Sequence, residues 1–255
     1  TCVYLDPIGA QLPLTGSAWP ASIITLSYLL IALKYGKKWM NGRKPFDITR
    51  ILIGYNLVQV IYNAIMFSFI FYYYVIEPMY NFSCMTTLPL DHPTKHVERM
   101  ITYAFMINKM VDLLDTIFIL LRKSYKQITT LHVFHHAVMV YITFWVHRLY
   151  GIGGQLMTME LLNTFVHTLM YSYYMISAIY PGLKGSLWWK KYITKIQIIQ
   201  FVLILLHSIY TLFTPGCEYP LIIHFIIVSL SITFIVMFTT FYIRVYNKPQ
   251  QQKQN

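Results

Sequence analysis

Three histidines lie close together in the apolar segment "LHVFHHAVMVY", residues 131–141. His132, His135 and His136 are related by steps of three and four residues, so a helix would place their rings on one face. At the start of such a helix, the helix dipole and burial both disfavour imidazolium, and we expect uncharged rings. An uncharged imidazole can bind a metal, act as a base or act as a nucleophile. A single buried histidine is usually hydrogen-bonded core, but three within five residues favour chemistry.

Further ionisable side chains occur in the preceding apolar segment, "NKMVDLLDTIFILLRK". Steps of three, four and seven place Lys109, Asp112 and Thr116 on one helical stripe, where Lys109 can pair with Asp112. A purely structural ion pair is an alternative interpretation of these two residues, since pairing is how charges are tolerated inside proteins. Asp115 falls outside the stripe and can meet another helix.

A second polar stripe runs through "ELLNTFVHTLMYSYY". Asn163 precedes His167 by one helical turn and can fix its tautomer. Tyr171 and Tyr174 continue the stripe, although for tyrosines alone packing is a more usual role than catalysis. Gln197 and Gln200 lie in "TKIQIIQ", where amides can join helices or bind substrate.

The composition predicts an all-α integral membrane protein, because 56% of the residues are hydrophobic and 11% are charged, against roughly 25% charged in soluble domains. Mean hydropathy is +0.51. About 20 apolar residues span a bilayer as a helix. We expect one polytopic domain, 1–255, with seven transmembrane helices near 19–35, 51–76, 99–121, 131–148, 156–178, 196–213 and 221–243, and a basic tail, 244–255.

The distribution of lysine and arginine predicts the orientation, because cytosolic loops carry an excess of both. In the seven-span topology, 16 of the 20 cations lie on one side, in 33–50, 122–130, 179–195 and the tail. The carboxyl terminus is therefore expected in the cytosol and the amino terminus on the exoplasmic side. The net charge of +11 follows from this topology, and we expect no nucleic-acid partner. No signal peptide is recognisable, and the start at Thr1 could be truncated.

Two loops on the exoplasmic side carry groups that are modified in an oxidising lumen. Asn81-Phe82-Ser83 is a glycosylation sequon in one loop, and Cys84 follows it directly. Cys217 lies in the other loop, so a Cys84–Cys217 disulfide is allowed, with two free thiols as the alternative. Cys2 is left over as a free thiol.

The pattern HxxHH is used by two kinds of membrane enzyme. Di-iron desaturases and hydroxylases need several histidine clusters on the cytosolic side, and this chain has one. The pair His92 and His96 falls on the opposite side, so His167 is the one addition to the three clustered histidines. Four ligands suffice for a single metal but not for two. We therefore expect no metal, with a metal-dependent lipid desaturase or hydroxylase as the alternative.

The second user is the fatty acid elongase family (ELO-type 3-oxoacyl-CoA synthases), which this chain resembles closely. "KMVDLLDTIFILLRK" is similar to the family's KxxExxDTxFxxLRK, "NTFVHTLMYSYY" to NxxxHxxMYxYY, and "TKIQIIQ" to TxxQxxQ. "KPFDITRILIGYNLVQVIYN" resembles the run that enters the second elongase span, and the matches cover roughly 43–200. Asp112 stands where the family usually has glutamate, which keeps the carboxylate and shortens its reach.

The resemblance implies the condensation step of fatty acid elongation in the endoplasmic reticulum membrane. Acyl-CoA and malonyl-CoA would give 3-oxoacyl-CoA, CO2 and CoA, without a cofactor. Six of the seven spans would enclose a substrate tunnel. Other elongation-cycle enzymes, the reductases and the dehydratase, are expected partners, and a homodimer is open. The implied substrate-binding residues are Lys109, Asp112, Thr116, Arg122, Lys123, Tyr171, Tyr174, Lys184, Lys190, Lys191, Gln197 and Gln200.

By analogy with the family's middle histidine, His135 would attack the thioester and form an acyl-imidazole, because no cysteine lies within the spans. His167, oriented by Asn163, would polarise groups or transfer protons. His132 and His136 would orient the nucleophile or stabilise charge, and Asp115 would support them. A seven-helix receptor or transporter is a further alternative, but its polar stripes would not need three clustered histidines.

Overall fold

A computed structural model describes residues 6–149, 153–180, 182 and 187–247. These residues form helices and loops, and no β-strand occurs among them. Helices are expected here because a backbone in hydrocarbon must satisfy its hydrogen bonds internally. The α-helices are α1 (Trp19–Leu30), α2 (Gly36–Met40), α3 (Thr49–Phe71), α4 (Lys95–Val111), α5 (Leu114–Leu121), α6 (Thr130–Leu149), α7 (Leu156–Ile179), α8 (Leu187–Leu212) and α9 (Leu221–Tyr242). Turns of π-helix continue α1, α3 and α9 over Ile31–Tyr35, Tyr72–Ile76 and Ile243–Asn247.

Three helices in the described part of the chain are long and apolar enough to cross a membrane. They are Thr49–Ile76, Trp188–Leu212 and Leu221–Asn247, and they match the spans expected near 51–76, 196–213 and 221–243. The four other expected spans are helical as well, in α1, α4 with α5, α6 and α7. They are shorter or carry the polar stripes, so their crossing of the membrane stays a prediction.

The segment expected as one helix over 99–121 is two helices, α4 and α5. Asp112 and Leu113 form a turn between them. The N–H groups of Leu113, Asp115 and Thr116 each donate to the carbonyl three residues earlier, at Met110, Asp112 and Leu113. These shorter i→i+3 bonds tighten the chain locally, as in a 3₁₀ turn. The apolar pattern continues through the turn, which explains why the sequence reads as one span.

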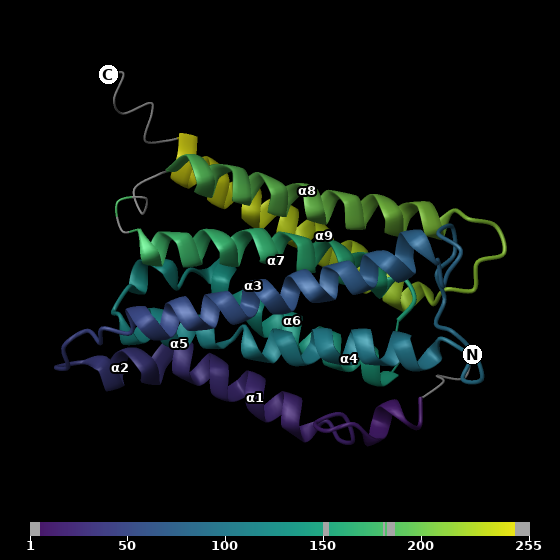
Figure 1. Cartoon of the computed structure of the whole chain (residues 1–255), viewed down its shortest axis with the longest axis horizontal. Coiled ribbons are helices and arrows are strands. Elements are labelled where there is room, and N and C mark those ends of the chain that lie inside the picture. Colours follow the sequence, from purple (N-terminus) through teal and green to yellow (C-terminus); the bar gives the residue numbers. More distant parts are fainter. Residues whose placement is uncertain (1–5, 150–152, 181, 183–186, 248–255) are drawn as a thin grey trace. The chain divides into compact units, whose positions relative to one another are not determined.

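The chain divides into two compact units. The first unit is Thr1–Thr49 with Thr87–Gly153, and the second is Arg50–Thr86 with Gly154–Asn255. The first unit contains α1, α2, α4, α5 and α6, and the second contains α3, α7, α8 and α9 (Figure 1).

The core of the first unit lies where α1 packs against α6. Tyr28 of α1 and Ala32 of the π-helical turn that continues it pack with Val133, Ala137 and Val140 from α6. The alanines let the two backbones approach closely, as small residues do in membrane helix pairs. A smaller cluster of Ala21, Met106 and Phe144 continues this core toward α4.

The second unit is organised around neighbouring helices α8 and α9 (Figure 1). The Phe201 ring of α8 stacks on Phe234 of α9 at 4.9 Å between centroids and lies 5.5 Å from Phe238. Helix α3 contacts α7 through Phe67 and Phe165, whose ring centroids are 5.4 Å apart. Aromatic packing therefore joins helices that carry few charges.

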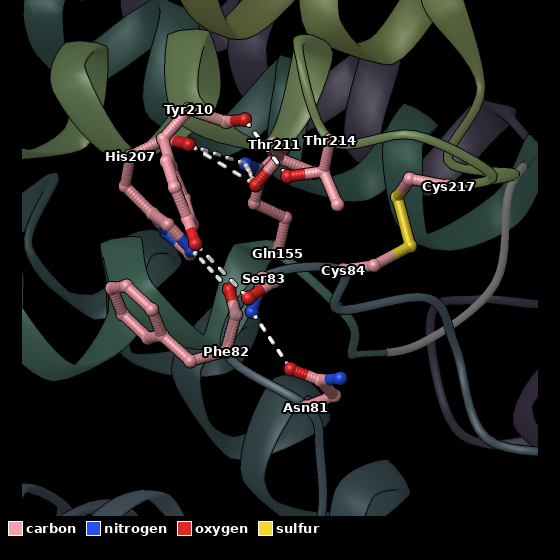
Figure 2. Close-up of a disulfide and its surroundings, with 10 residues drawn as sticks. All are labelled: Asn81, Phe82, Ser83, Cys84, Gln155, His207, Tyr210, Thr211, Thr214 and Cys217. Atoms are coloured by element: carbon pink, nitrogen blue, oxygen red, sulfur yellow. Dashed lines mark hydrogen bonds between the residues drawn. A yellow bond between two sulfur atoms is a disulfide. The ribbon is translucent and has the colours of Figure 1, made fainter.

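A disulfide joins Cys84, in the loop after α3, to Cys217, in the loop between α8 and α9 (Figure 2). Beside it, the His207 ring stacks on Phe82 at 4.4 Å between centroids. Its Nε2 lies 3.0 Å from the Phe82 carbonyl, which can only accept, so Nε2 carries the proton. Nδ1 then accepts from Thr158 Oγ1 at 2.9 Å. This covalent and hydrogen-bonded clamp fixes the loop that follows α3.

The predicted sequon lies on the exposed edge of this clamp (Figure 2). The Asn81 side-chain oxygen accepts from the Ser83 backbone N–H at 3.0 Å, and the Ser83 hydroxyl lies 3.1 Å from that of Tyr210. The sequon and both cysteines therefore belong to one end of the second unit, as the predicted topology requires.

An ion pair in the first unit ties the segment before α1 to α4. Asp6 accepts from Arg99 Nε at 2.8 Å and from Arg99 Nη2 at 3.1 Å. Its Oδ1 also accepts from the backbone N–H groups of Ile8 and Gly9. Burial alone raises the pKa of the Asp6 carboxyl, but the Arg99 hydrogen bonds and charge, with the two backbone donors, outweigh burial and lower that pKa below its ordinary value.

The lowered pKa predicts how stability depends on pH. Because the folded carboxyl binds protons less readily than the unfolded one, Asp6 contributes stability above its ordinary pKa of about 4. This contribution is lost as pH falls through the lower folded pKa. We expect the difference in thermal stability between the wild type and Asp6→Asn, measured in detergent, to be largest near neutrality and to shrink below about pH 4. A difference that stayed constant down to pH 2 would contradict this assignment.

Candidate active site

Helix α6 begins where it does because Thr129 caps it. Thr129 Oγ1 accepts from the His132 backbone N–H at 3.2 Å, and its carbonyl accepts from Val133 N–H at 3.0 Å. A threonine at this position satisfies one of the amide groups that the first turn leaves without a partner. The cap therefore places the clustered histidines in the first two turns of the helix.

The His132 ring is oriented by a hydrogen-bonded chain across three helices. Its Nε2 lies 2.8 Å from Thr116 Oγ1 of α5, and Thr116 Oγ1 lies 3.0 Å from the Tyr28 hydroxyl of α1. Thr116 is fully buried, so its hydroxyl has no access to water and the two contacts fix it. Thr116 was expected on this stripe, but Tyr28 was not identified from the sequence.

The three imidazole rings of α6 lie together. His132 and His136 have ring centroids 4.4 Å apart, and His135 meets His136 edge-on at 5.6 Å. The Tyr28 ring lies 6.4 Å from His136. All three histidines are half-buried. This arrangement offers several imidazole nitrogens within one small volume, which suits both proton transfer and nucleophilic attack.

Lys109 and Asp112 form a buried ion pair immediately before the break between α4 and α5. Lys109 Nζ lies 2.7 Å from Asp112 Oδ2, and the two side chains are 1% and 2% exposed. The same ammonium group lies 4.9 Å from the centre of the Phe105 ring. The aspartate side chain, although shorter than the glutamate usual at this position, therefore reaches Lys109. Asp115 is half-buried in the first turn of α5.

The basic pair Arg122 and Lys123 directly follows helix α5. Ser124 N–H donates to the Ile119 carbonyl and Lys123 N–H to the Leu120 carbonyl, which together form a Schellman motif. Lys123 takes the left-handed position, with φ of 56°, where glycine is usual. Arg122 is half-buried and its Nε donates to the Phe118 carbonyl at 3.4 Å. The backbone of Lys123 is therefore strained, because a residue with a side chain occupies a position that favours glycine.

The second polar stripe lies in the second unit, on α7. Asn163 and His167 are buried, Tyr171 is fully buried and Tyr174 is 42% exposed. The Tyr171 ring centroid lies 5.6 Å from His167 and 6.0 Å from Tyr174. The stripe is therefore a buried face of α7 that becomes exposed at Tyr174. Pairing between Asn163 and His167 stays a prediction.

The expected residues of α8 are also placed in the second unit. Gln197 Nε2 donates to Met170 Sδ at 3.8 Å. Gln200 is buried, and its Oε1 has no hydrogen-bond partner among the described residues. Lys190 is half-buried and Lys191 Nζ lies 5.9 Å from the centre of the Tyr242 ring. Lys184 lies outside the described residues.

The sequence analysis missed a line of buried amides on α3. Asn56, Gln59 and Asn63 are 5%, 1% and 0% exposed. Their spacing of three and four residues, in a span with no charge, was a signal that could have identified them. Among the described residues, no group of three or more histidine, cysteine or acidic side chains is arranged to hold a metal ion.

The Lys109–Asp112 pair predicts an asymmetric response to mutation. Lys109→Met or Asp112→Leu alone leaves one buried charge without its main partner, and we expect each to reduce stability by about 3–5 kcal/mol. The double variant removes both charges, so its loss is expected to be smaller than that of either single variant. Thermal unfolding of the four proteins in detergent measures these differences. Additive losses in the double variant would show that the two charges do not stabilise each other.

Comparison with known proteins identifies the family. The model of the ELO (GNS1/SUR4) family matches residues 13–254. Very long chain fatty acid elongase F of Drosophila melanogaster is 40% identical over 253 residues, which are 98% of this chain and 98% of that protein. Very long chain fatty acid elongase 7 of the same species is 36% identical over 95% of this chain and 73% of its own length. Elongase 4 of Mus musculus is 36% identical over 99% of this chain and 80% of its own length. The chain, with its histidine cluster and the motifs around it, belongs to the ELO family.

Proposed function

We propose that this chain is the condensing enzyme of fatty acid elongation, a 3-oxoacyl-CoA synthase that joins acyl-CoA to malonyl-CoA and releases CO2 and CoA. Family membership supports the reaction, since the related proteins are named very long chain fatty acid elongases. The observation that carries the proposal in this chain is the cluster of three imidazole rings, oriented through Thr116 and Tyr28, within apolar helices.

In the first stage, His135 attacks the carbonyl carbon of the acyl thioester through an uncharged ring nitrogen. The new carbon–nitrogen bond forms as the carbon–sulfur bond breaks and CoA leaves as a thiolate. The proton on the other ring nitrogen is lost to a neighbouring base, which leaves a neutral acyl-imidazole. Covalent catalysis of this kind replaces one difficult step with two easier ones.

In the second stage, malonyl-CoA loses CO2, and the electron pair of the broken carbon–carbon bond forms an enolate. The enolate carbon attacks the acyl-imidazole, the carbon–nitrogen bond breaks, and the departing imidazole takes a proton back from the neighbouring base, which regenerates the histidine. His167, with Asn163 beside it, transfers protons or polarises the thioester carbonyl. His132 and His136 orient His135 and stabilise developing charge, supported by Asp115.

The substrate contacts follow from chemistry and family resemblance. Apolar helices enclose the acyl chain in a tunnel, and Tyr171, Tyr174, Gln197 and Gln200 contribute to its polar part. Lys109, Asp112 and Thr116 contact the thioester end. The proposed contacts for the phosphates of CoA are the basic residues Arg122 and Lys123 of the first unit and Lys184, Lys190 and Lys191 of the second, because fixed cations attract anionic groups.

The proposed location is the endoplasmic reticulum membrane, with seven spans, a lumenal amino terminus and a cytosolic carboxyl terminus. The Cys84–Cys217 disulfide supports this orientation, since disulfides persist in oxidising compartments. Asn81 is the proposed glycan acceptor on that side. Asn81 lies five residues past the helical turn that ends at Ile76, a reach of about 17 Å when extended. Because this is a short distance from the end of the helix, the sequon supports the orientation less strongly than the disulfide does.

His135→Ala is expected to abolish 3-oxoacyl-CoA formation, because no acyl-enzyme can form. Intact-mass measurement after mixing wild-type protein with acyl-CoA alone should show an acyl adduct at His135, and none in the variant. His96→Ala is the matched control, since this histidine is exposed at the start of α4; it should keep both activity and adduct. Turnover by His135→Ala, or a stoichiometric metal in active protein, would overturn the mechanism.

Lys123→Gly is expected to change stability and substrate binding in opposite directions. Glycine removes the left-handed penalty of about 1–2 kcal/mol, offset in part by about 0.4–1 kcal/mol from the freer unfolded chain. The variant should therefore be slightly more stable. Its KM for acyl-CoA should rise about tenfold, because one charged phosphate contact is lost.

Leu14→Gly is the control for this change, because Leu14 is also left-handed, with φ of 69°, and precedes α1. We expect it to gain similar thermal stability with unchanged KM. A Lys123→Gly protein with wild-type KM would exclude Lys123 from the CoA site.

A further inference from the structure

The buried amides of α3 form a ladder that ends on an aromatic ring. Asn63 Nδ2 donates to the Gln59 carbonyl at 2.8 Å and to Gln59 Oε1 at 3.3 Å. Gln59 Nε2 in turn donates to the Tyr55 hydroxyl at 3.2 Å. The hydrogen bonds therefore run in one direction along the helix, from Asn63 through Gln59 to Tyr55.

The ladder is not required for a helix to cross the membrane. Helix α9 contains no asparagine or glutamine, yet it is long and apolar enough to span. Burying an amide among apolar side chains is unfavourable unless it is hydrogen-bonded. Gln59 and Asn63 are 1% and 0% exposed, so α3 has a free-energy cost of burying side-chain amides that α9 does not have. This difference calls for a role beyond insertion.

The ladder connects to the second polar stripe through two tyrosine rings. Tyr55 meets Tyr171 edge-on, with ring centroids 5.9 Å apart and planes at 84°. Tyr171 is fully buried, and its ring centroid lies 5.6 Å from that of His167. These separations fall in the range of favourable aromatic contacts. The position of the Tyr55 hydroxyl therefore constrains the rings against which His167 packs.

We propose that Gln59 is a positioning residue for His167, acting through Tyr55 and Tyr171, with Asn63 fixing the amide of Gln59. This inference rests on the proposed function, in which His167 takes part in proton transfer or polarisation. Such a role requires a ring nitrogen within hydrogen-bond reach of the reacting group. A displacement of about 1 Å in a group of this kind can reduce the rate about a hundredfold.

Gln59→Met tests the proposal, because methionine has a similar volume and makes neither of the strong hydrogen bonds. We expect kcat for condensation to fall about ten- to a hundredfold, with the KM for acyl-CoA within twofold of the wild type. The pH profile of kcat should shift as well, since the group that moves protons is displaced. A variant that loses thermal stability but keeps its kcat and pH profile would overturn the proposal.

Tyr55→Phe provides an independent test should Gln59→Met fold poorly, because it removes the hydroxyl and keeps the ring. It should reproduce the fall in kcat, and the double variant should be no slower than the slower single variant, since both changes break the same chain. Multiplicative effects of the two substitutions would contradict the chain. Ser68→Ala is the control on the same helix, because Ser68 is exposed and donates to the Ala64 carbonyl; it should leave kcat unchanged.

His167→Gln separates failure of this inference from failure of the proposed function. If His167→Gln retains wild-type turnover, the role of His167 is wrong and the positioning proposal falls with it. If His167→Gln is inactive while Gln59→Met and Tyr55→Phe behave like the wild type, the positioning proposal alone is wrong.

Discussion

The constraint on which this structure depends is the burial of polar groups in helices that are otherwise apolar. Most such groups have a partner, since unpaired charges and amides are strongly unfavourable away from water. The Lys109–Asp112 ion pair and the Tyr28–Thr116–His132 chain meet this requirement within the first unit, and the Asn63–Gln59–Tyr55 ladder meets it within the second. The partners also fix side-chain orientation, so the same interactions that make burial tolerable position the groups that can do chemistry.

Irregular backbone occurs next to these polar groups. The turn at Asp112 and Leu113 contains the carboxylate of the buried ion pair, and Lys123 adopts its left-handed conformation two residues after α5 ends. In both places the regular helix is interrupted at a charged side chain. In contrast, α9 contains no amide or charged residue and continues without a break from Leu221 to Tyr242.

The two ends of the second unit have different chemistry. At one end, the Cys84–Cys217 disulfide and the two hydrogen bonds of His207 hold the loops together. The other end carries Lys190 and Lys191, whose charges act over longer distances. The second unit therefore has a disulfide at one end and basic side chains at the other.

The sequence by itself determined the all-helical fold and the approximate positions of most helices, and it singled out the residues proposed to carry the chemistry. It could do so because hydropathy and the 3.6-residue period are local properties, and because the HxxHH and DTxFxxLRK patterns are contiguous. It also placed Cys84 and Cys217 on one side through the charge rule for loops.

Only the tertiary structure decided which polar side chains meet. Tyr28 and Thr116 are 88 residues apart, and Tyr55 and Tyr171 belong to helices that are distant in sequence, so no local pattern predicts either contact. The break after Val111 was also invisible, because apolar residues continue through it and backbone hydrogen bonding, not composition, defines it. Side-chain partners in a membrane protein depend on how helices pack, and packing is a property of the folded chain.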